Sequence, residues 1–591
     1  MTKLSIKPCA EAACSTAARV AKDIVSDIGE AALNSGGLLQ LSRVGSQNAE
    51  RDTHRIMVRR FHLSLQPWVP LSEIQVDNRK LTVLRLKTWM EFLLRKHCMH
   101  ICAGLKRPHE ERQDAIFDEF WSRYKCSNPE HPVFNLEREG RLRLSRCIPV
   151  VYHGDEGRGR RRHPFLVTSF TPILGRGTQP ADRRRKKFGI RKDFRKLQTN
   201  FKGHSYTNRW LQAAWPKAVY ENEAAFEKLL QLAKDDNDIM LHQGVCDERT
   251  GKQYFAVILA VIGDWPWLIK SGKLARNFNH VVKQARDIAA PEGICHLCRA
   301  GQRGHNFENL QTRTPSWLAT IGQQDPFIQP PSPLSTLPHA PGQAFSLFQF
   351  DVWHTCHLGV CKAFCGAALA LLSETYPARS KDARFQLLND DFMQWCKTHG
   401  RQPLLTKLTK ETLGWESNAN YPSGSWYKGS LSTTLCEFIE SATKGKQFDD
   451  ELLTKCGEAA ESLNQFMTGL YEQDAFLDKT AAFNLGEFGL RFLRRYSFCA
   501  AKAVRERRCL FVITPKFHAL HHVCLVDMVL ASSRFRWISN PLIYSVQMLE
   551  DYVGRNSRVS RRIHPATATK RCAERHLQLA YAKFYQAGYL Q

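Results

Sequence analysis

The chain has 591 residues, of which 43% are apolar and 10% aromatic, a composition that excludes intrinsic disorder and supports a large core, in more than one domain. Lys and Arg number 84 against 57 Asp and Glu, and the net charge of +27 favours a polyanionic partner such as nucleic acid, although a basic protein without one has the same balance. The 19 Cys are scattered and odd in number, and no signal peptide is recognisable, which predicts reduced thiols in the cytosol or nucleus rather than a disulfide framework.

The first 140 residues are predicted to contain no catalytic strand. Residues 1–50 are small and polar, with a helix-breaking Ser35-Gly36-Gly37, and are expected to be a poorly ordered tail. Residues 51–140 are expected to form a helical N-terminal region, because apolar residues recur at helical spacing with Lys and Arg between them. The basic face could hold DNA, but solvated helix faces have the same pattern.

The first part of the core, residues 141–310, is predicted to open with a β-hairpin. Residues 147–155 read as a buried strand that ends at Asp155, followed by a turn at Glu156-Gly157. Residues 165–170 are the expected partner strand, across a long basic loop.

A dense basic block follows this hairpin. Residues 156–202 contain fifteen Lys or Arg against three acids. Such a block is typical of a nuclear localisation signal or a loop that contacts DNA phosphates, and a disordered solvated run is the alternative. Its place between two candidate core segments favours a DNA-binding loop, and its densest residues are Arg183, Arg184, Arg185, Lys186 and Lys187.

The next segments carry the most specific signals. Residues 206–235 are predicted to form one amphipathic helix. Residues 254–262 are a continuous apolar run, rich in β-branched residues, that predicts a strand buried on both faces. Asp264 follows at the carboxyl end of that strand, where open α/β sheets place their chemistry. Cys295 and Cys298 then form a CxxC pair with metal-ligand spacing.

The rest of the chain is mostly helical in pattern. Residues 311–510 are expected to be a large helical insertion, and residues 511–591 the C-terminal part of the core, with a final helix that carries Glu550. Asp351 and His354 fit a helix cap followed by a satisfied histidine. The longest apolar run, about residues 367–372, is too short to span a bilayer, so no membrane is expected.

Three carboxylates could form a site for hard cations. If Asp155, Asp264 and Glu550 converge, their oxygens could hold two Mg²⁺ or Mn²⁺ ions for phosphoryl transfer. The pattern alone is weak, because the 57 acids of the chain offer many such triples.

The CxxC pair needs two further ligands for a tetrahedral zinc site. His518 and His522 are four residues apart, so a helix would place both on one face. Together with Cys295 and Cys298 they would complete a structural Cys₂His₂ site, in which His521 could replace either histidine. The alternative is a pair of buried free thiols with unrelated histidines.

These blocks resemble the RNase H-like DDE transposases of cut-and-paste DNA elements, nearest to the CACTA (En/Spm) group. Leu259 to Pro266 with the CxxC pair resembles a strand that ends in Asp-aromatic-Pro ahead of a Cys pair. Phe350 to Cys361 resembles the Asp-x-x-His block, and Pro515 to His522 the final block. The V(D)J recombinase catalytic subunit is a more distant relative with a similar order of residues. The family's last Glu lies near a proline, where this chain has Pro541-Leu542-Ile543, so the acid has moved to Glu550 or Asp551, or this copy has lost it.

The resemblance implies an α/β fold: an RNase H-like mixed-sheet core interrupted by a large all-helical insertion, with a helical N-terminal region. It implies a nuclear transposase that cuts and transfers DNA strands at element ends and target, with Asp155, Asp264 and Glu550 as catalytic residues. Mg²⁺ or Mn²⁺ would be the catalytic cofactor and Zn²⁺ a structural one. A homo-oligomer is left open. The alternatives are an inactive, transposase-derived DNA-binding protein and an RNase H-like nuclease outside transposition.

Overall fold

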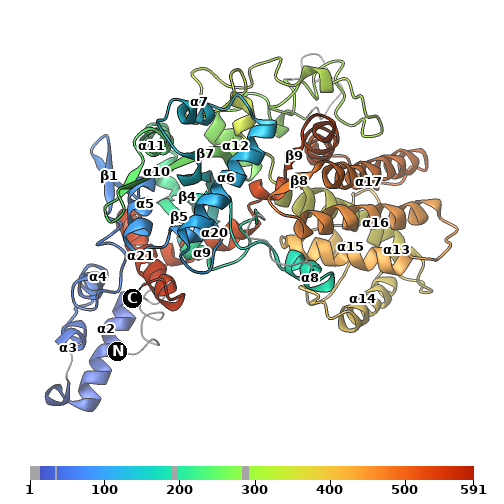
Figure 1. Ribbon diagram of the computed structural model, residues 1–591. Coiled ribbons are helices and arrows are strands. Elements are labelled where there is room, and N and C mark those ends of the chain that lie inside the picture. The colour runs from blue at the N-terminus through green and yellow to red at the C-terminus, as the bar shows by residue number, and fades with distance from the viewer. Residues whose placement is uncertain (1–12, 34–35, 190–196, 282–291, 591) are drawn as a thin grey trace.

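The computed structural model describes residues 13–33, 36–189, 197–281 and 292–590. Two large apolar cores divide this part of the chain. One surrounds a five-stranded sheet and includes the N-terminal region and the last helices, and the other lies within the helices of the insertion. In Figure 1 the sheet and the insertion lie side by side, with the helices around α2 at the edge of the sheet unit.

The sheet is mixed, as an α/β fold requires. Its order is β5-β4-β3-β7-β6, with β3 and β4 antiparallel, β4 and β5 antiparallel, β3 and β7 parallel, and β6 and β7 antiparallel. The predicted hairpin and the long buried strand are both confirmed. The strand bounds are β3 Cys147–Arg158, β4 Pro164–Pro172, β5 Trp210–Pro216, β6 Val245–Asp247 and β7 Lys252–Gly263.

Two predictions about these strands are wrong. Strand β3 does not end at Asp155: it continues through the expected turn, because Gly157 still pairs with Phe165 of β4. The predicted helix over residues 206–235 begins instead with the edge strand β5. The apolar residues of this strand are buried on both faces, a pattern that periodicity cannot distinguish from a buried helix. The short helices α9 (Ser205–Asn208) and α10 (Lys217–Tyr220) flank this strand, and the only long helix of the stretch is α11 (Glu223–His242), which begins at the cap residue Asn222.

The N-terminal region has more structure than predicted. Residues 1–12 of the predicted loose tail lie outside the described residues, but the described part from residue 13 contains three helices that share a small apolar cluster around Ala21, Leu41 and Met57. An ion pair between Glu50 and Arg575, 2.5 Å long, ties them to the last helix of the chain. A β-hairpin, β1 (Ser72–Val76) with β2 (Arg79–Val83), also interrupts the helical region. The helices are α2 Cys14–Ile28, α3 Gly36–Ser42, α4 Ala49–Arg59, α5 Leu86–Arg95, α6 Glu110–Ser127 and α7 Val133–Arg138.

The insertion is helical, as expected, and folds around its own core. Its first helix, Trp353–Glu374, combines the π-helical segment η10 (Trp353–Val360) with α13 (Cys361–Glu374), and it is long and apolar enough to cross a membrane by length and composition. However, 78% of its apolar window is buried within the fold, as in a core helix. The other long helices are α14 Lys381–Thr398, α15 Gly429–Thr443, α16 Glu451–Glu472 and α17 Lys479–Arg505.

The chain returns to the sheet after the insertion. Strands β8 (Phe476–Asp478) and β9 (Trp537–Ser539) pair where the insertion closes. Helix α20 (Gln547–Ser560) then packs on β3 and β4, and α21 (Ala568–Gln586) packs on β5. The remaining α-helices are α8 Gln179–Lys187, α9 Ser205–Asn208, α10 Lys217–Tyr220, α12 Trp265–Gly272, α18 Pro515–His521 and α19 Ala531–Arg534.

Candidate active site and metal centre

Two of the predicted acids lie side by side on adjacent strands. Gly154 of β3 pairs with Gly263 of β7 in parallel register, so the residues that follow them, Asp155 and Asp264, occupy neighbouring positions. Asp264 is also the N-cap of α12: its Oδ1 accepts a hydrogen bond of 2.8 Å from the backbone N–H of Trp267. The Asp-Trp-Pro sequence explains this turn, because Asp is a good cap and Pro suits the first helical turn.

The paired glycines make room for Trp267. A β-carbon on Gly263 would lie 2.2 Å from Cδ1 of the indole, and one on Gly154 would lie 2.4 Å from its Cη2. The buried ring therefore packs directly against β3 at Gly154 and against the end of β7 at Gly263. It supports the two backbone positions from which Asp155 and Asp264 project.

Helix α20 brings the third acid to the same place. Gly157 of β3 allows a close approach, since a β-carbon there would lie 2.4 Å from Ser557 Oγ of α20. Glu550 is seven residues before Ser557, so both lie on the face of α20 that meets β3. Asp551 instead points away, exposed, and pairs with Arg555 at 2.6 Å. The geometry thus selects Glu550 over Asp551.

The Asp351–His354 motif joins this cluster. His354 lies between two carboxylates, with Nδ1 2.7 Å from Asp351 Oδ2 and Nε2 3.3 Å from Glu550 Oε1. Asp351 is fully buried and caps the helix, as the sequence suggested, by accepting from the backbone N–H groups of Trp353 and His354, each at 2.8 Å. Its Oδ1 also accepts from Val546 N–H at 3.0 Å, 195 residues away, and so fixes the start of α20.

The carboxylates repel one another in a partly buried setting. Burial raises the pKa of Asp155 well above its usual range, and the charges of Asp264 and Glu550 raise it further. Burial and the charge of Asp351 likewise raise the pKa of Asp264 and of Glu550. For His354, burial opposes protonation, but the hydrogen bond and charge of Asp351, with Glu550 and Asp155, raise the pKa to about 9.

The acid cluster is open rather than closed around one point. Among the described residues, the groups whose ligand atoms all lie within 4.8 Å of one another do not include these acids. The Glu550 side chain is 39% exposed, so the cluster can be reached from solvent.

A lysine that the sequence reasoning missed faces the same cluster. Burial and the charge of the neighbouring Lys362 together lower the pKa of Lys516 to about 8, against the charges of Asp351 and Asp264, which raise it. Lys516 lies two residues before His518 on α18. Its proximity to the acids depends on the fold and has no local signal.

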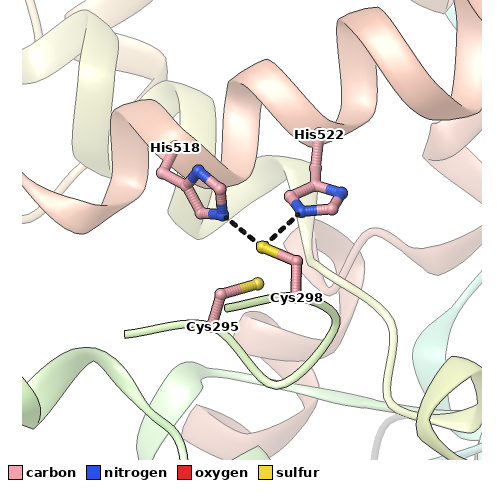
Figure 2. A group of neighbouring side chains, drawn as sticks. All are labelled: Cys295, Cys298, His518 and His522. Atoms are coloured by element: carbon pink, nitrogen blue, oxygen red, sulfur yellow. Dashed lines mark hydrogen bonds between the residues drawn. The ribbon is translucent and has the colours of Figure 1, made fainter. Parts of the chain in front are cut away.

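Four residues from two distant segments form a compact Cys/His group. Cys295, Cys298, His518 and His522 are all buried, and their ligand atoms lie within 4.8 Å of one another. Figure 2 shows both histidines projecting from one helix toward the CxxC loop, with Nε2 of His518 and of His522 3.4 and 3.3 Å from Cys298 Sγ. Burial lowers the pKa of His518, which favours the neutral imidazole that binds metals. This donor set could hold a metal ion such as zinc.

The surroundings of this group fix its parts in place. Arg276, which is buried, donates hydrogen bonds to the carbonyl oxygens of Cys295 and His296, at 3.0 and 3.1 Å. Trp317 packs on the histidines and stacks on the ring of His522. His521, the suggested substitute ligand, is outside the group and lies edge-on to Trp317.

A second buried group contains three thiols. Cys361, Cys365 and Cys436 lie within 4.8 Å of one another in the insertion, and they too could hold a metal. The sulfurs already have partners, however: Cys361 and Cys365 donate to Ser432 O and Cys436 to Ala460 O, at 3.4 to 3.8 Å.

The densest part of the basic block, residues 183–187, lies in a helix rather than a loop, and residues 190–196 of the block lie outside the described residues. Residues 183–187 end α8, which packs on α16 of the insertion (Figure 1). Arg185 forms ion pairs with Asp182 and Asp474 and is largely covered, whereas Lys186 and Lys187 are exposed. Contact of this block with DNA stays a prediction.

No model of a known protein family matches the sequence, and no curated protein matches it. The candidate site therefore rests on its own residues and geometry.

Proposed function

We propose that the protein is a DNA transposase that cuts and transfers DNA strands with an acidic site on an RNase H-like core. One observation carries this proposal: Asp155, Asp264 and Glu550, which come from three distant parts of the chain, interact with one another and with His354. Strongly perturbed carboxylates of this kind are typical of functional sites.

The sheet supports the proposed fold. An RNase H-like core has an antiparallel three-stranded meander, then a helix, then a strand parallel to the first. Strands β3, β4 and β5, helix α11 and strand β7 follow this order. Phe348 adds a short parallel bridge to Val261 on β7, three residues before Asp351. The edge strand β6 is antiparallel, so it lies outside this pattern.

The acid cluster fits divalent cations by its chemistry. Its donors are hard oxygens, and its carboxylates outnumber the one histidine, His354, that pairs with them. The side chain of Glu550 is partly exposed to solvent. Asp155, Asp264 and Glu550 would hold Mg²⁺ or Mn²⁺, which when bound would activate the attacking oxygen and stabilise the leaving oxygen of a phosphodiester. Asp351 orients His354 toward Glu550, and Trp267 fixes Asp264. The Cys₂His₂ group fits Zn²⁺ in a structural role.

Cleavage of DNA tests this proposal directly. The substrate is a supercoiled plasmid that carries the genomic sequence flanking the gene, incubated with Mg²⁺ or Mn²⁺. Asp155→Ala, Asp264→Ala and Glu550→Ala should each abolish cleavage and leave DNA binding largely intact, because the acids act on the reacting atoms. Asp551→Ala is the matched control and should stay active. Full cleavage by Asp155→Ala or Asp264→Ala would refute the site.

One observation favours the inactive DNA-binding alternative. Glu550 is already paired with His354, and the acidic oxygens are not gathered at one point. If the wild-type protein binds DNA but cleaves it with neither metal, this alternative replaces the enzyme. Cleaved products without joined strands would indicate a nuclease instead.

A further inference from the structure

Six exposed arginines form a surface next to the acid cluster. They lie at the tip of the β3–β4 hairpin and on the last turns of α20, and we name them the basic ridge: Arg158, Arg160, Arg161, Arg162, Arg558 and Arg561. Helix α20 packs against both β3 and the hairpin tip. Strand β3, which carries Asp155, and helix α20, which carries Glu550, therefore both also carry residues of the basic ridge.

The basic ridge is held together by its own backbone contacts. Arg561 Nε donates to Arg158 O at 3.0 Å, and Arg160 Nη1 donates to Ile563 O at 3.4 Å. These bonds join the hairpin tip to the end of α20, and they leave positive charge unneutralised because their acceptors are carbonyl oxygens. A hollow of about 530 Å³ lies alongside, and its lining includes Arg160, Arg161 and an ion pair of 3.0 Å between Lys217 and Glu221.

The hairpin tip has an unusual backbone that displays its arginines. Arg161 and Arg162 have φ values of 51° and 62°, in the left-handed region that side chains other than Gly rarely adopt. Such a conformation is strained, and it persists where surrounding structure holds it. Both arginines are exposed here, and Arg161 lines the hollow.

We infer that the basic ridge binds the phosphate backbone of substrate DNA a few nucleotides from the bond that is cut. This inference rests on the proposed function. From Glu550 to Arg558 the helix rises about 12 Å, at about 1.5 Å per residue. Along one DNA strand, with about 3.4 Å per nucleotide, that distance corresponds to roughly three or four nucleotides. The geometry thus gives the ridge a defined place on the DNA and not only a general affinity.

Salt-dependent binding measures the phosphate contacts without cleavage. The variant is Arg161→Gln, Arg162→Gln and Arg558→Gln together, which keeps Arg160 and Arg561 with their backbone bonds. The control is Arg379→Gln, Arg505→Gln and Arg507→Gln, three exposed arginines of the insertion, of which Arg507 also has a positive φ. Binding of a random-sequence duplex in EDTA is followed by fluorescence anisotropy over a range of salt, and thermal unfolding verifies that both variants fold.

The ridge variant should flatten the slope of log K against log salt by about two to three units, since each lost phosphate contact removes about 0.9, and the control should keep the wild-type slope. Equal slopes in the two variants, with wild-type DNA binding intact, would overturn the ridge while leaving the proposed function standing. If the wild type binds no DNA, the proposed function itself fails. Loss of binding to phosphatidylserine vesicles with an unchanged DNA slope would assign the ridge to a membrane surface and also overturn the inference.

Neutral methylphosphonate linkages then test the position on a DNA that the protein cleaves. A neutral linkage three or four nucleotides from the cut should slow the wild-type protein and leave the ridge variant unaffected. Equal sensitivity of both proteins at those positions would contradict the placement.

Discussion

At the scale of single residues, the position of Asp264 depends on one aromatic ring. Trp267 fills the space left by Gly154 and Gly263, and its backbone N–H donates a hydrogen bond to the Asp264 carboxylate. Gly263→Ala would place a β-carbon 2.2 Å from the indole, so the ring or the strand must move. We expect a loss of about 1–3 kcal/mol in the free energy of unfolding, as is typical of overpacking, measured by urea denaturation.

The matched control for this substitution is Gly45→Ala. Gly45 is exposed and a β-carbon there meets nothing within 4 Å, so its stability should stay within about 0.5 kcal/mol of the wild type. Equal stability of the two variants would mean that Trp267 does not constrain the backbone of the two strands at Gly154 and Gly263.

The residues of the candidate site differ in how visible they are in the sequence. Asp264 is visible because an apolar run, a cap residue and a proline stand together. For Asp351 the sequence indicates only the helix cap, which is a local contact. The hydrogen bond that Asp351 accepts from Val546 N–H joins residues 195 apart and has no local pattern. The position of Lys516 beside Asp264 and Asp351 has no sequence signal, because it depends on how α18 packs.

At the scale of elements, the Cys/His group joins two segments more than 200 residues apart. His296, inside the CxxC loop, bonds to Phe348 O at 2.7 Å, and Phe348 in turn bridges to β7. Helix α18 carries Lys516 and His518, and the π-helical segment η12 (His522–Leu530), which continues it directly, carries His522. A metal at this group would therefore fix the loop and the helix on either side of the acid cluster.

Metal content tests that link. We expect one zinc ion per purified chain, and Cys295→Ser or His522→Ala should lower zinc content and thermal stability together, because a structural zinc site is part of the fold. Cys436→Ser is the control from the three-thiol group and should leave zinc content unchanged, since those sulfurs already donate to carbonyl oxygens. A folded protein without zinc would contradict the site, and two ions per chain would point to the three-thiol group as well.

The elements also show where sequence patterns fail. The CxxC spacing and the histidines four residues apart are local signals on each side, so the four residues could be named although their contact is distant. Strand β5 could not be recognised, because Trp210 to Pro216 is apolar on both faces and its partner, β4, lies outside the window that periodicity examines. The extension of β3 past Asp155 depends equally on pairing with β4.

At the scale of the whole molecule, the fold is held together where its distant parts meet. His576 on α21 is fully buried between aromatic rings of three other helices: Trp89 of α5, Tyr206 of α9 and Tyr552 of α20. Its Nδ1 lies 2.9 Å from Asn556 Oδ1, an oxygen that only accepts, so Nδ1 carries the proton. Nε2 has no hydrogen-bond partner among the described residues. Protonation would thus create a buried donor without an acceptor.

This junction should make the protein sensitive to acid. Burial lowers the pKa of His576 from 6.5 to about 3, so below pH 6.5 the unfolded chain binds a proton that the folded chain does not. The stability that His576 contributes is complete above pH 6.5 and falls by about 1.4 kcal/mol per pH unit as the pH drops toward 3.

The raised pKa values of Asp155, Asp264 and Glu550 act in the opposite direction, so the measured quantity is the difference in pH slope between wild type and His576→Gln. Urea denaturation between pH 6.5 and 5 should give a slope that is about 1 kcal/mol per unit shallower in the variant, because the unfolded histidine is only partly protonated near pH 6.5, whereas His399→Gln, at an exposed histidine, should keep the wild-type slope. Identical slopes in wild type and His576→Gln would mean that this histidine takes up its proton without unfolding the junction.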